Sequence, residues 1–303
     1  MPLGSGLATL VGGTVAVADA KITATSRIRL TTLTPGGTVG TPYVASRTAG
    51  TGFTITSTSG TDTSTVFYEV VTYAVTTFDA VASPILDLGP GLWLKPEALS
   101  ALSGGAAVAT WPDSSGDGVD VTQATGAQQP LYQTAQQNGL PAVVFDGVND
   151  WLTRAAFKLP TKAASVFVVS RLDAAGSYPD MMSYGLTGTE IEFRYSAATG
   201  QPEWVTNLGN TVAPTAVTLG AWHQFTGMAD GASRSFWVDA ALISSVADAF
   251  TPTASNILGI GSRSSGVSMF GGAIAEMLIF PYALTTAQRQ TVEAYLKAKW
   301  ATP

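Results

Sequence analysis

The sequence contains no cysteine, a single histidine and few charged residues. Without cysteine there can be no disulfide, no thiolate nucleophile and no thiolate metal site. One histidine likewise excludes a histidine metal cluster. Charged residues make up only 12% of the chain, and the net charge is −6 with no basic stripe. This balance argues against nucleic acid or an anionic membrane as a partner, and no apolar run reaches the roughly 20 residues of a membrane span.

The 303 residues are enough for two domains of about 150 residues each. Glycine, threonine, serine, alanine and valine dominate, which favours many short strands joined by glycine-rich turns over helices. The apolar run from Leu7 to Ala20 could pass for a secretion signal. However, no positive charge precedes it and Gly12-Gly13 interrupts it, so a strand fits better.

Residues 1–75 are predicted to form a small all-β module for anchoring and oligomerisation, and residues 76–91 a linker marked by Pro84, Gly89 and Pro90. Glycine-rich turns separate the expected strands, which are residues 8–17, 21–25, 27–32, 43–46, 53–57 and 64–71. Both faces of the last strand are apolar. A module this small buries too little surface alone, so we expect it to pack against copies of itself or another protein.

Four segments of this module resemble a small β module found in tailed-phage virion proteins. They are residues 22–24, 26–31, 50–55 and 64–71, in that order. The resemblance implies that the chain is part of a virion.

Residues 92–303 form the predicted second domain. Ala273 to Phe280 reads as a strand buried on both faces, which Pro281 ends because it lacks a backbone donor. Thr285 or Thr286 can cap an amphipathic helix that runs to Trp300. Glu276 is the only charge in the buried strand, and we interpret it as a fold residue whose carboxylate accepts hydrogen bonds from loop amides.

Several motifs in this domain together resemble the concanavalin A-like lectin/glucanase superfamily in its laminin-G-like branch. They are W-x-D-x-S-G at 111–116, F-D-G-x-x-D at 145–150, W-H at 222–223, the W-V-D-A-A hairpin at 237–241 and the buried strand with its terminal helix. The resemblance implies an all-β fold, an antiparallel two-sheet jelly roll with one C-terminal helix. Ala240 stands where the family usually has glycine.

An acidic loop holds Asp113, Asp117 and Asp120, whose oxygens could bind calcium. Calcium ions occur on the rims of the superfamily that the domain resembles. The alternative is that Asp113 and Ser115 fold a glycine-rich turn by bonding their own backbone, and no bidentate glutamate closes the loop. No other cofactor is expected.

Enzymatic activity is not expected. Glu190 and Glu192 share one strand face, and paired carboxylates can hydrolyse glycosides. Glucanases of the superfamily carry a longer acidic motif that this chain lacks, so solvent-facing carboxylates are the preferred interpretation. Nothing beside His223 suggests a catalytic triad, and we expect it to be an ordinary strand residue.

Aromatic rings in polar surroundings are the best indication of a sugar site, because the apolar faces of sugars stack on exposed rings. Trp204 and Tyr195 are the preferred pair, with Glu192 and Tyr178 beside them. This site is predicted to bind host or environmental glycans weakly.

We therefore expect a virion surface protein that decorates the capsid, a decoration protein or head fibre, with the major capsid protein and itself, as a homotrimer, as partners. The first alternative is a tail-fibre or receptor-binding protein that recognises host surface carbohydrate. The second is a secreted glycan-binding protein or glucanase.

Overall fold

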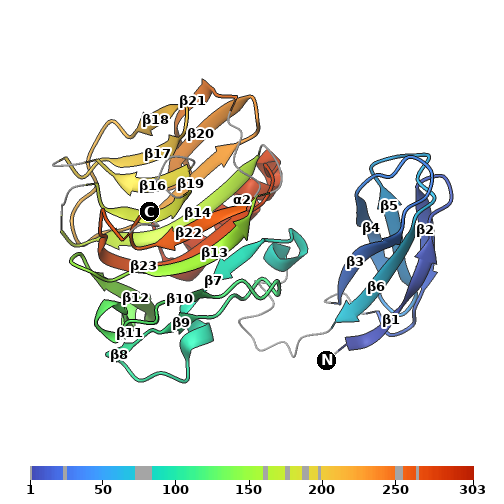
Figure 1. Ribbon diagram of the computed structural model, residues 1–303, viewed down its shortest axis with the longest axis horizontal. Coiled ribbons are helices and arrows are strands. Elements are labelled where there is room, and N and C mark those ends of the chain that lie inside the picture. Colours follow the sequence, from blue (N-terminus) through green and yellow to red (C-terminus); the bar gives the residue numbers. More distant parts are fainter. Residues whose placement is uncertain are drawn as a thin grey trace. The chain divides into compact units, whose positions relative to one another are not determined.

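The chain divides into two compact units, Met1–Asp87 and Leu88–Pro303 (Figure 1). The computed structural model describes residues 2–22, 26–71, 84–159, 163–174, 178–185, 191–196, 199–249, 255–263 and 266–303. Half of the linker expected at 76–91, residues 76–83, therefore lies outside the described residues, as does Glu190. Among the described residues, no helix is both long and apolar enough to cross a membrane.

The first unit contains two antiparallel three-stranded sheets. One has the order β1 (Pro2–Thr9), β6 (Thr65–Val71), β3 (Arg27–Thr34), and the other β2 (Thr14–Ala18), β5 (Gly52–Ser57), β4 (Pro42–Thr48). Their buried apolar residues form a small core of Ala8, Leu10, Ile22, Phe53, Ile55, Val66 and Val70.

The single strand expected over residues 8–17 is wrong, because the chain turns there between β1 and β2. Gly12 and Gly13 adopt φ values of 60° and 76°, which a β-branched residue would not tolerate. A side chain at Gly13 would also collide with the backbone of Ser59, at 2.3 Å from its carbonyl oxygen. The glycine pair therefore makes a tight turn rather than interrupting one strand.

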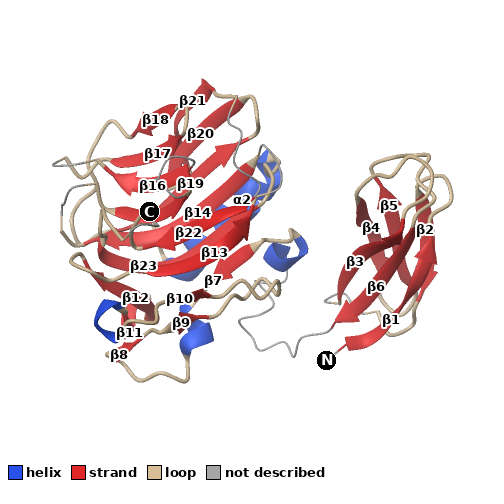
Figure 2. Cartoon of the chain, in the orientation of Figure 1, coloured by secondary structure: helices blue, strands red, loops and turns tan. Residues whose placement is uncertain are grey.

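The second unit is a jelly-roll-like sandwich of two large antiparallel sheets (Figure 2). The eight-stranded sheet has the order β18 (Gly209–Val212), β17 (Pro202–Thr206), β16 (Ile191–Tyr195), β15 (Asp180–Tyr184), β22 (Ser255–Ile260), β13 (Leu152–Lys158), β10 (Val121–Thr122), β9 (Thr110–Trp111). The nine-stranded sheet has the order β21 (Ala241–Ala247), β20 (Ser233–Val238), β19 (Trp222–Ala229), β14 (Ala164–Leu172), β23 (Gly271–Phe280), β12 (Leu140–Asp146), β11 (Leu131–Gln137), β8 (Ala106–Ala107), with β7 (Leu92–Leu94) also paired to β23. Two short 3-10 helices, η1 (Pro96–Leu99) and η2 (Gly126–Gln128), lie between strands.

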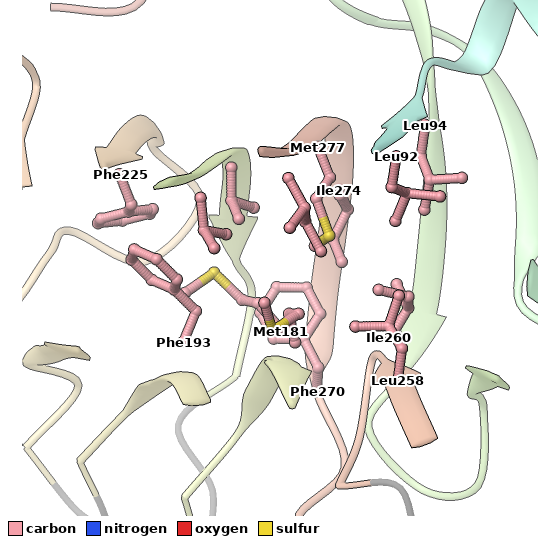
Figure 3. Packing of buried hydrophobic residues seen from close by; sticks show 14 of the residues in the cluster. Leu92, Leu94, Met181, Phe193, Phe225, Leu258, Ile260, Phe270, Ile274 and Met277 are labelled. Carbon is pink, nitrogen blue, oxygen red and sulfur yellow. The ribbon is translucent and has the colours of Figure 1, made fainter. Parts of the chain in front are cut away.

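The core lies between these sheets, where each contributes one apolar face. Figure 3 shows Phe225, Ile274 and Met277 of the nine-stranded sheet facing Phe193 and Leu258 of the eight-stranded sheet. All five side chains are completely buried. The predicted all-β fold, with a small N-terminal module, a two-sheet jelly roll and one C-terminal helix, is confirmed.

The terminal helix α2 (Thr286–Trp300) begins at a complete capping box, in which the side chains of Thr285 and Gln288 each accept from the other's backbone N–H. It packs on the outer face of the nine-stranded sheet against β14 and β19. Thr226 of β19 donates to Glu293 of the helix at 3.0 Å. The helix therefore covers a sheet face that would otherwise be open to water.

Glu276 fixes this helix to the buried strand β23. Its Oε1 accepts from Trp93 Nε1 at 2.5 Å and from Tyr295 Oη at 2.8 Å. Its Oε2 accepts from Lys299 Nζ at 2.7 Å and from Trp300 Nε1 at 2.8 Å. Glu276 is thus a fold residue, as expected, but the expected partners were wrong, since side chains of β7 and α2 bind it rather than loop amides.

His223 lies in β19, where its Nδ1 is 2.7 Å from Oδ2 of Asp239. Asp239 and Ala240 form the turn between β20 and β21 at φ values of 50° and 63°. The expected hairpin is therefore present. The positive φ at Ala240 explains why glycine suits this position better.

Candidate functional site

The face of the eight-stranded sheet turned away from the core is charged at β15, β16 and β17. Side chains alternate between the two faces of a strand. Ile191, Phe193 and Tyr195 of β16 enter the core, so Glu192 and Arg194 lie on the opposite face. We call Asp180, Glu192, Arg194, Glu203 and Arg263 the outer charged cluster.

The strand register sets much of this cluster. Asp180, Arg194 and Glu203 are direct neighbours across β15, β16 and β17. Arg194 binds Glu203 through Nε at 2.8 Å and Glu192 through Nη1 at 2.6 Å. A cation between carboxylates stabilises such a cross-strand row.

Arg263, which follows β22, completes the cluster. Its Nε lies 3.0 Å from Oε1 of Glu192 and 3.3 Å from Oδ2 of Asp180. Burial raises the pKa of Asp180 to about 8, with a further contribution from Glu192, and burial also raises the pKa of Glu192. Burial thus favours the protonated forms of Asp180 and Glu192, and the guanidinium groups of Arg194 and Arg263 oppose this shift.

Tyr178 borders the cluster and is its most accessible ring. The guanidinium of Arg194 lies 4.6 Å from the centre of that ring, a cation–π distance. The residue is 40% exposed, and its backbone has a φ of 55°. A bulky residue rarely adopts this conformation, and such strain concentrates at ligand sites.

The prediction that Trp204 and Tyr195 offer stacking faces to a sugar is wrong. Both side chains are completely buried. The ring of Trp204 packs 4.6 Å from that of Phe193, and Tyr195 packs 5.9 Å from Phe225. Strand alternation places both rings in the core, on the face opposite to Glu192.

The structure brings together only two of the four predicted glycan-site residues, Glu192 and Tyr178, through Arg194. Glu192 is not the solvent-facing carboxylate that was expected, because it is completely buried and two arginines bind it. Sequence reasoning missed Arg194, Glu203, Asp180 and Arg263. The alternation around Phe193 would have indicated Arg194, whereas nothing in the sequence links residue 263 to this face.

The acidic loop folds as a turn around Asp113. Its Oδ1 accepts from the backbone N–H of Trp93 and Ser115, and its Oδ2 from the Ser115 hydroxyl and Val119 N–H. Asp120 in turn accepts from the backbone N–H of Asp113. Because four protein donors already occupy Asp113, the loop does not fit a calcium ion, and the described residues contain no cluster of three metal-binding side chains. Asp117 is exposed at its edge.

Two family models match parts of the chain. Residues 4–71 match the C-terminal domain of K1 capsule-specific polysaccharide lyase. Residues 146–288 match the concanavalin A-like lectin/glucanases superfamily. Among curated protein sequences, none is similar enough to this chain to indicate a relative.

Solved structures share the fold at low sequence identity. Trypanosoma rangeli sialidase, in complex with the inhibitor DANA, is 11% identical with a TM-score of 0.51; the match covers 82% of this chain and 42% of the sialidase. The binding domain of botulinum neurotoxin serotype D is 10% identical with a TM-score of 0.50, covering 71% of this chain and 54% of that one. This chain therefore spans less than half of the sialidase, and the likeness concerns the lectin-like fold alone.

Proposed function

We propose that the jelly roll is a non-enzymatic glycan-binding domain whose sugar-contacting ring is Tyr178. One observation carries this proposal: an exposed aromatic ring is held at a strained backbone angle beside a half-buried guanidinium. Arg194 contacts the ring and is itself fixed by Glu192 and Glu203, so the ring is preorganised. The apolar face of a sugar would stack on Tyr178 while its hydroxyl groups contact the polar edge of the cluster.

Truncation of this ring tests the proposal. Tyr178→Ala in the full chain should weaken binding to an array of bacterial surface glycans by about twofold to twelvefold, since an aromatic contact contributes roughly 0.5–1.5 kcal/mol. Tyr178→Phe should bind nearly normally because it keeps the ring. Leu242→Ala, which removes an exposed apolar side chain from β21, is the matched control. Equal binding by Tyr178→Ala and the wild-type protein would refute the assignment.

The absence of hydrolysis is part of the proposal. Glu192 is enclosed by two guanidinium groups, so it is poorly placed to attack or protonate a substrate. Incubation of the protein with the glycans it binds should release no reducing ends. Release by the wild-type protein that disappears in Glu192→Gln would instead establish a glycosidase.

The first unit is proposed to anchor the protein and assemble it as a homotrimer. Five large apolar side chains on this small unit are between 48% and 76% exposed: Leu7, Val11, Leu33, Val39 and Tyr43. Each of its three-stranded sheets also has two edge strands that could pair further. Light scattering during size-exclusion chromatography should give three times the monomer mass, and Val11→Asp should reduce it; a monomeric wild-type protein would contradict the proposal.

At the level of the particle, we propose a location on the surface of a tailed-phage virion, with the first unit bound to the major capsid protein. Antibodies against residues 92–300, detected with gold in electron micrographs, should label the heads. The match of residues 4–71 to a domain of a capsule polysaccharide lyase favours a second candidate, a tail protein that recognises host carbohydrate. Label confined to the tail would establish that candidate, and unlabelled particles would leave a secreted glycan-binding protein.

A further inference from the structure

A second feature of the jelly roll is a cavity of about 390 Å³, and none of its described lining residues belongs to the outer charged cluster. β13 of the eight-stranded sheet contributes Arg154 and Lys158 to its lining. Gly91 and Pro281, which flank β7 and β23 of the nine-stranded sheet, contribute the other wall, and Asp117 comes from the acidic loop. The volume falls within the range of roughly 300–1,000 Å³ that small-molecule sites occupy.

Arg154 differs from the other arginines of this unit. Among the described residues, it forms no ion pair, whereas each of the others binds a carboxylate: Arg171, Arg194, Arg234, Arg263 and Arg289. The Nε atom of Arg154 is buried without a hydrogen-bond partner. Burying a charged donor in this way is unfavourable unless an acceptor binds it.

The backbone beside Arg154 is also unusual. The pairing of β13 with β22 shifts between Arg154 and Phe157, which marks a β-bulge. Ala156 within it has a φ of 55°, a conformation that costs an alanine about 1–2 kcal/mol. Bulges re-aim side chains next to binding sites, and Arg154 and Lys158, on either side of this one, both line the cavity.

We infer that this cavity binds the carboxylate of an acidic sugar residue, such as a uronic or sialic acid, within the glycan. The inference rests on the proposed glycan-binding function and specifies its ligand class. The planar guanidinium of Arg154 matches a carboxylate, to which it can donate two N–H bonds, and Lys158 adds a second cation. Among the described residues that line the cavity, Arg154, Lys158 and Asp117 give a net charge of about +1, which suits a singly charged carboxylate better than a phosphate dianion.

The test pairs acidic oligosaccharides with their carboxyl-reduced counterparts and measures the affinity of the full-length protein for both. Wild-type protein should prefer the acidic form, and Arg154→Gln should weaken that binding about tenfold or more without affecting the reduced form. Lys158→Gln should act in the same direction by a smaller factor. Asp117→Asn should strengthen binding, because it removes a carboxylate that repels the ligand. Lys297→Gln, a change of an exposed lysine on α2, is the control and should have no effect.

The possible failures are distinguishable. If acidic and reduced sugars bind equally well and Arg154→Gln binds like the wild-type protein, this inference is wrong while the glycan-binding function stands. If no glycan binds, both are wrong. Displacement of the acidic sugar by inorganic phosphate at similar concentration, with no preference for carboxylated sugars, would overturn the carboxylate assignment in favour of a phosphate site. Thermal unfolding of Arg154→Gln at the wild-type temperature establishes that the variant is folded.

Discussion

Replacing Glu276 with glutamine should destabilise the jelly roll more than almost any other conservative change. The carboxylate is completely buried and accepts from Trp93, Tyr295, Lys299 and Trp300. Burial alone would lower the pKa of Lys299, but Glu276 and Glu97 outweigh it and raise that pKa. Each oxygen of Glu276 accepts two of these hydrogen bonds. Glutamine keeps one oxygen, but its NH₂ group would replace the other and would then face two donors without accepting from either.

The size of the effect follows from Lys299. Removing one partner from a buried ion pair costs about 3–5 kcal/mol. For a domain of this size, each kcal/mol shifts Tm by about 2–4 °C, so Glu276→Gln should lower Tm by about 6–20 °C. Glu97, 36% exposed, also contacts Lys299 at 2.8 Å, and Glu97→Gln should cost no more than about 1 kcal/mol.

Scanning calorimetry of the full chain measures both variants, and only the transition of the jelly roll should move. A Tm for Glu276→Gln within about 2 °C of the wild-type value would refute the reasoning. So would an equal effect of Glu97→Gln, because the inner carboxylate would then be no more important than the exposed one.

Three further changes have defined outcomes. Raising the pH from about 5 to 8 should lower the Tm of the jelly roll. Folding raises the pKa of Asp180 from 3.8 to about 8, so the folded state retains a proton that the unfolded chain has lost, and this advantage fades as the pH approaches 8. Asp180→Asn should flatten the dependence of Tm on pH. A wild-type Tm that rises between about pH 5 and 8 would contradict the raised pKa of Asp180. Gly227→Ala places a Cβ 2.6 Å from the ring of Trp204 and should cost about 1–3 kcal/mol in urea unfolding; an unchanged midpoint would mean that the core adapts freely. Ala240→Gly should stabilise the hairpin by about 0.5–1 kcal/mol, since the φ of 63° disfavours alanine, and the absence of any gain in Tm would argue against strain at this turn.

The sequence predicted the architecture well where local patterns determine it. The apolar run ending at Pro281 is the buried strand β23, and Thr285, one of the two expected N-caps, caps the helix. What the pattern could not supply was the set of partners for Glu276, because Trp93 lies 183 residues away along the chain. Long-range pairing of this kind depends on the order of strands in the sheet, which no local signal contains.

The candidate site was predicted less well, for a reason that the sequence already contained. Glu192 and Tyr195 are three residues apart on a strand, so they must lie on opposite faces. The presence of an aromatic ring alone was therefore a poor guide to exposure. Because Glu192 and Arg194 flank the buried Phe193, alternation along the strand would have favoured these two side chains for the outer face. Tyr178 is different, because it precedes β15 and its orientation depends on the contact with Arg194.

The two proposed contacts, a ring at Tyr178 and a cation at Arg154, would each contribute modest affinity. Weak sites suffice if the first unit assembles several copies, since linked sites bind at a high effective concentration. A tenfold loss at each site could then become as much as roughly a thousandfold loss when three copies engage one surface. The effect of Tyr178→Ala on binding to a glycan-coated surface should therefore exceed its effect on a soluble oligosaccharide. Equal effects in the two assays would mean that single domains, rather than assemblies, recognise the glycan.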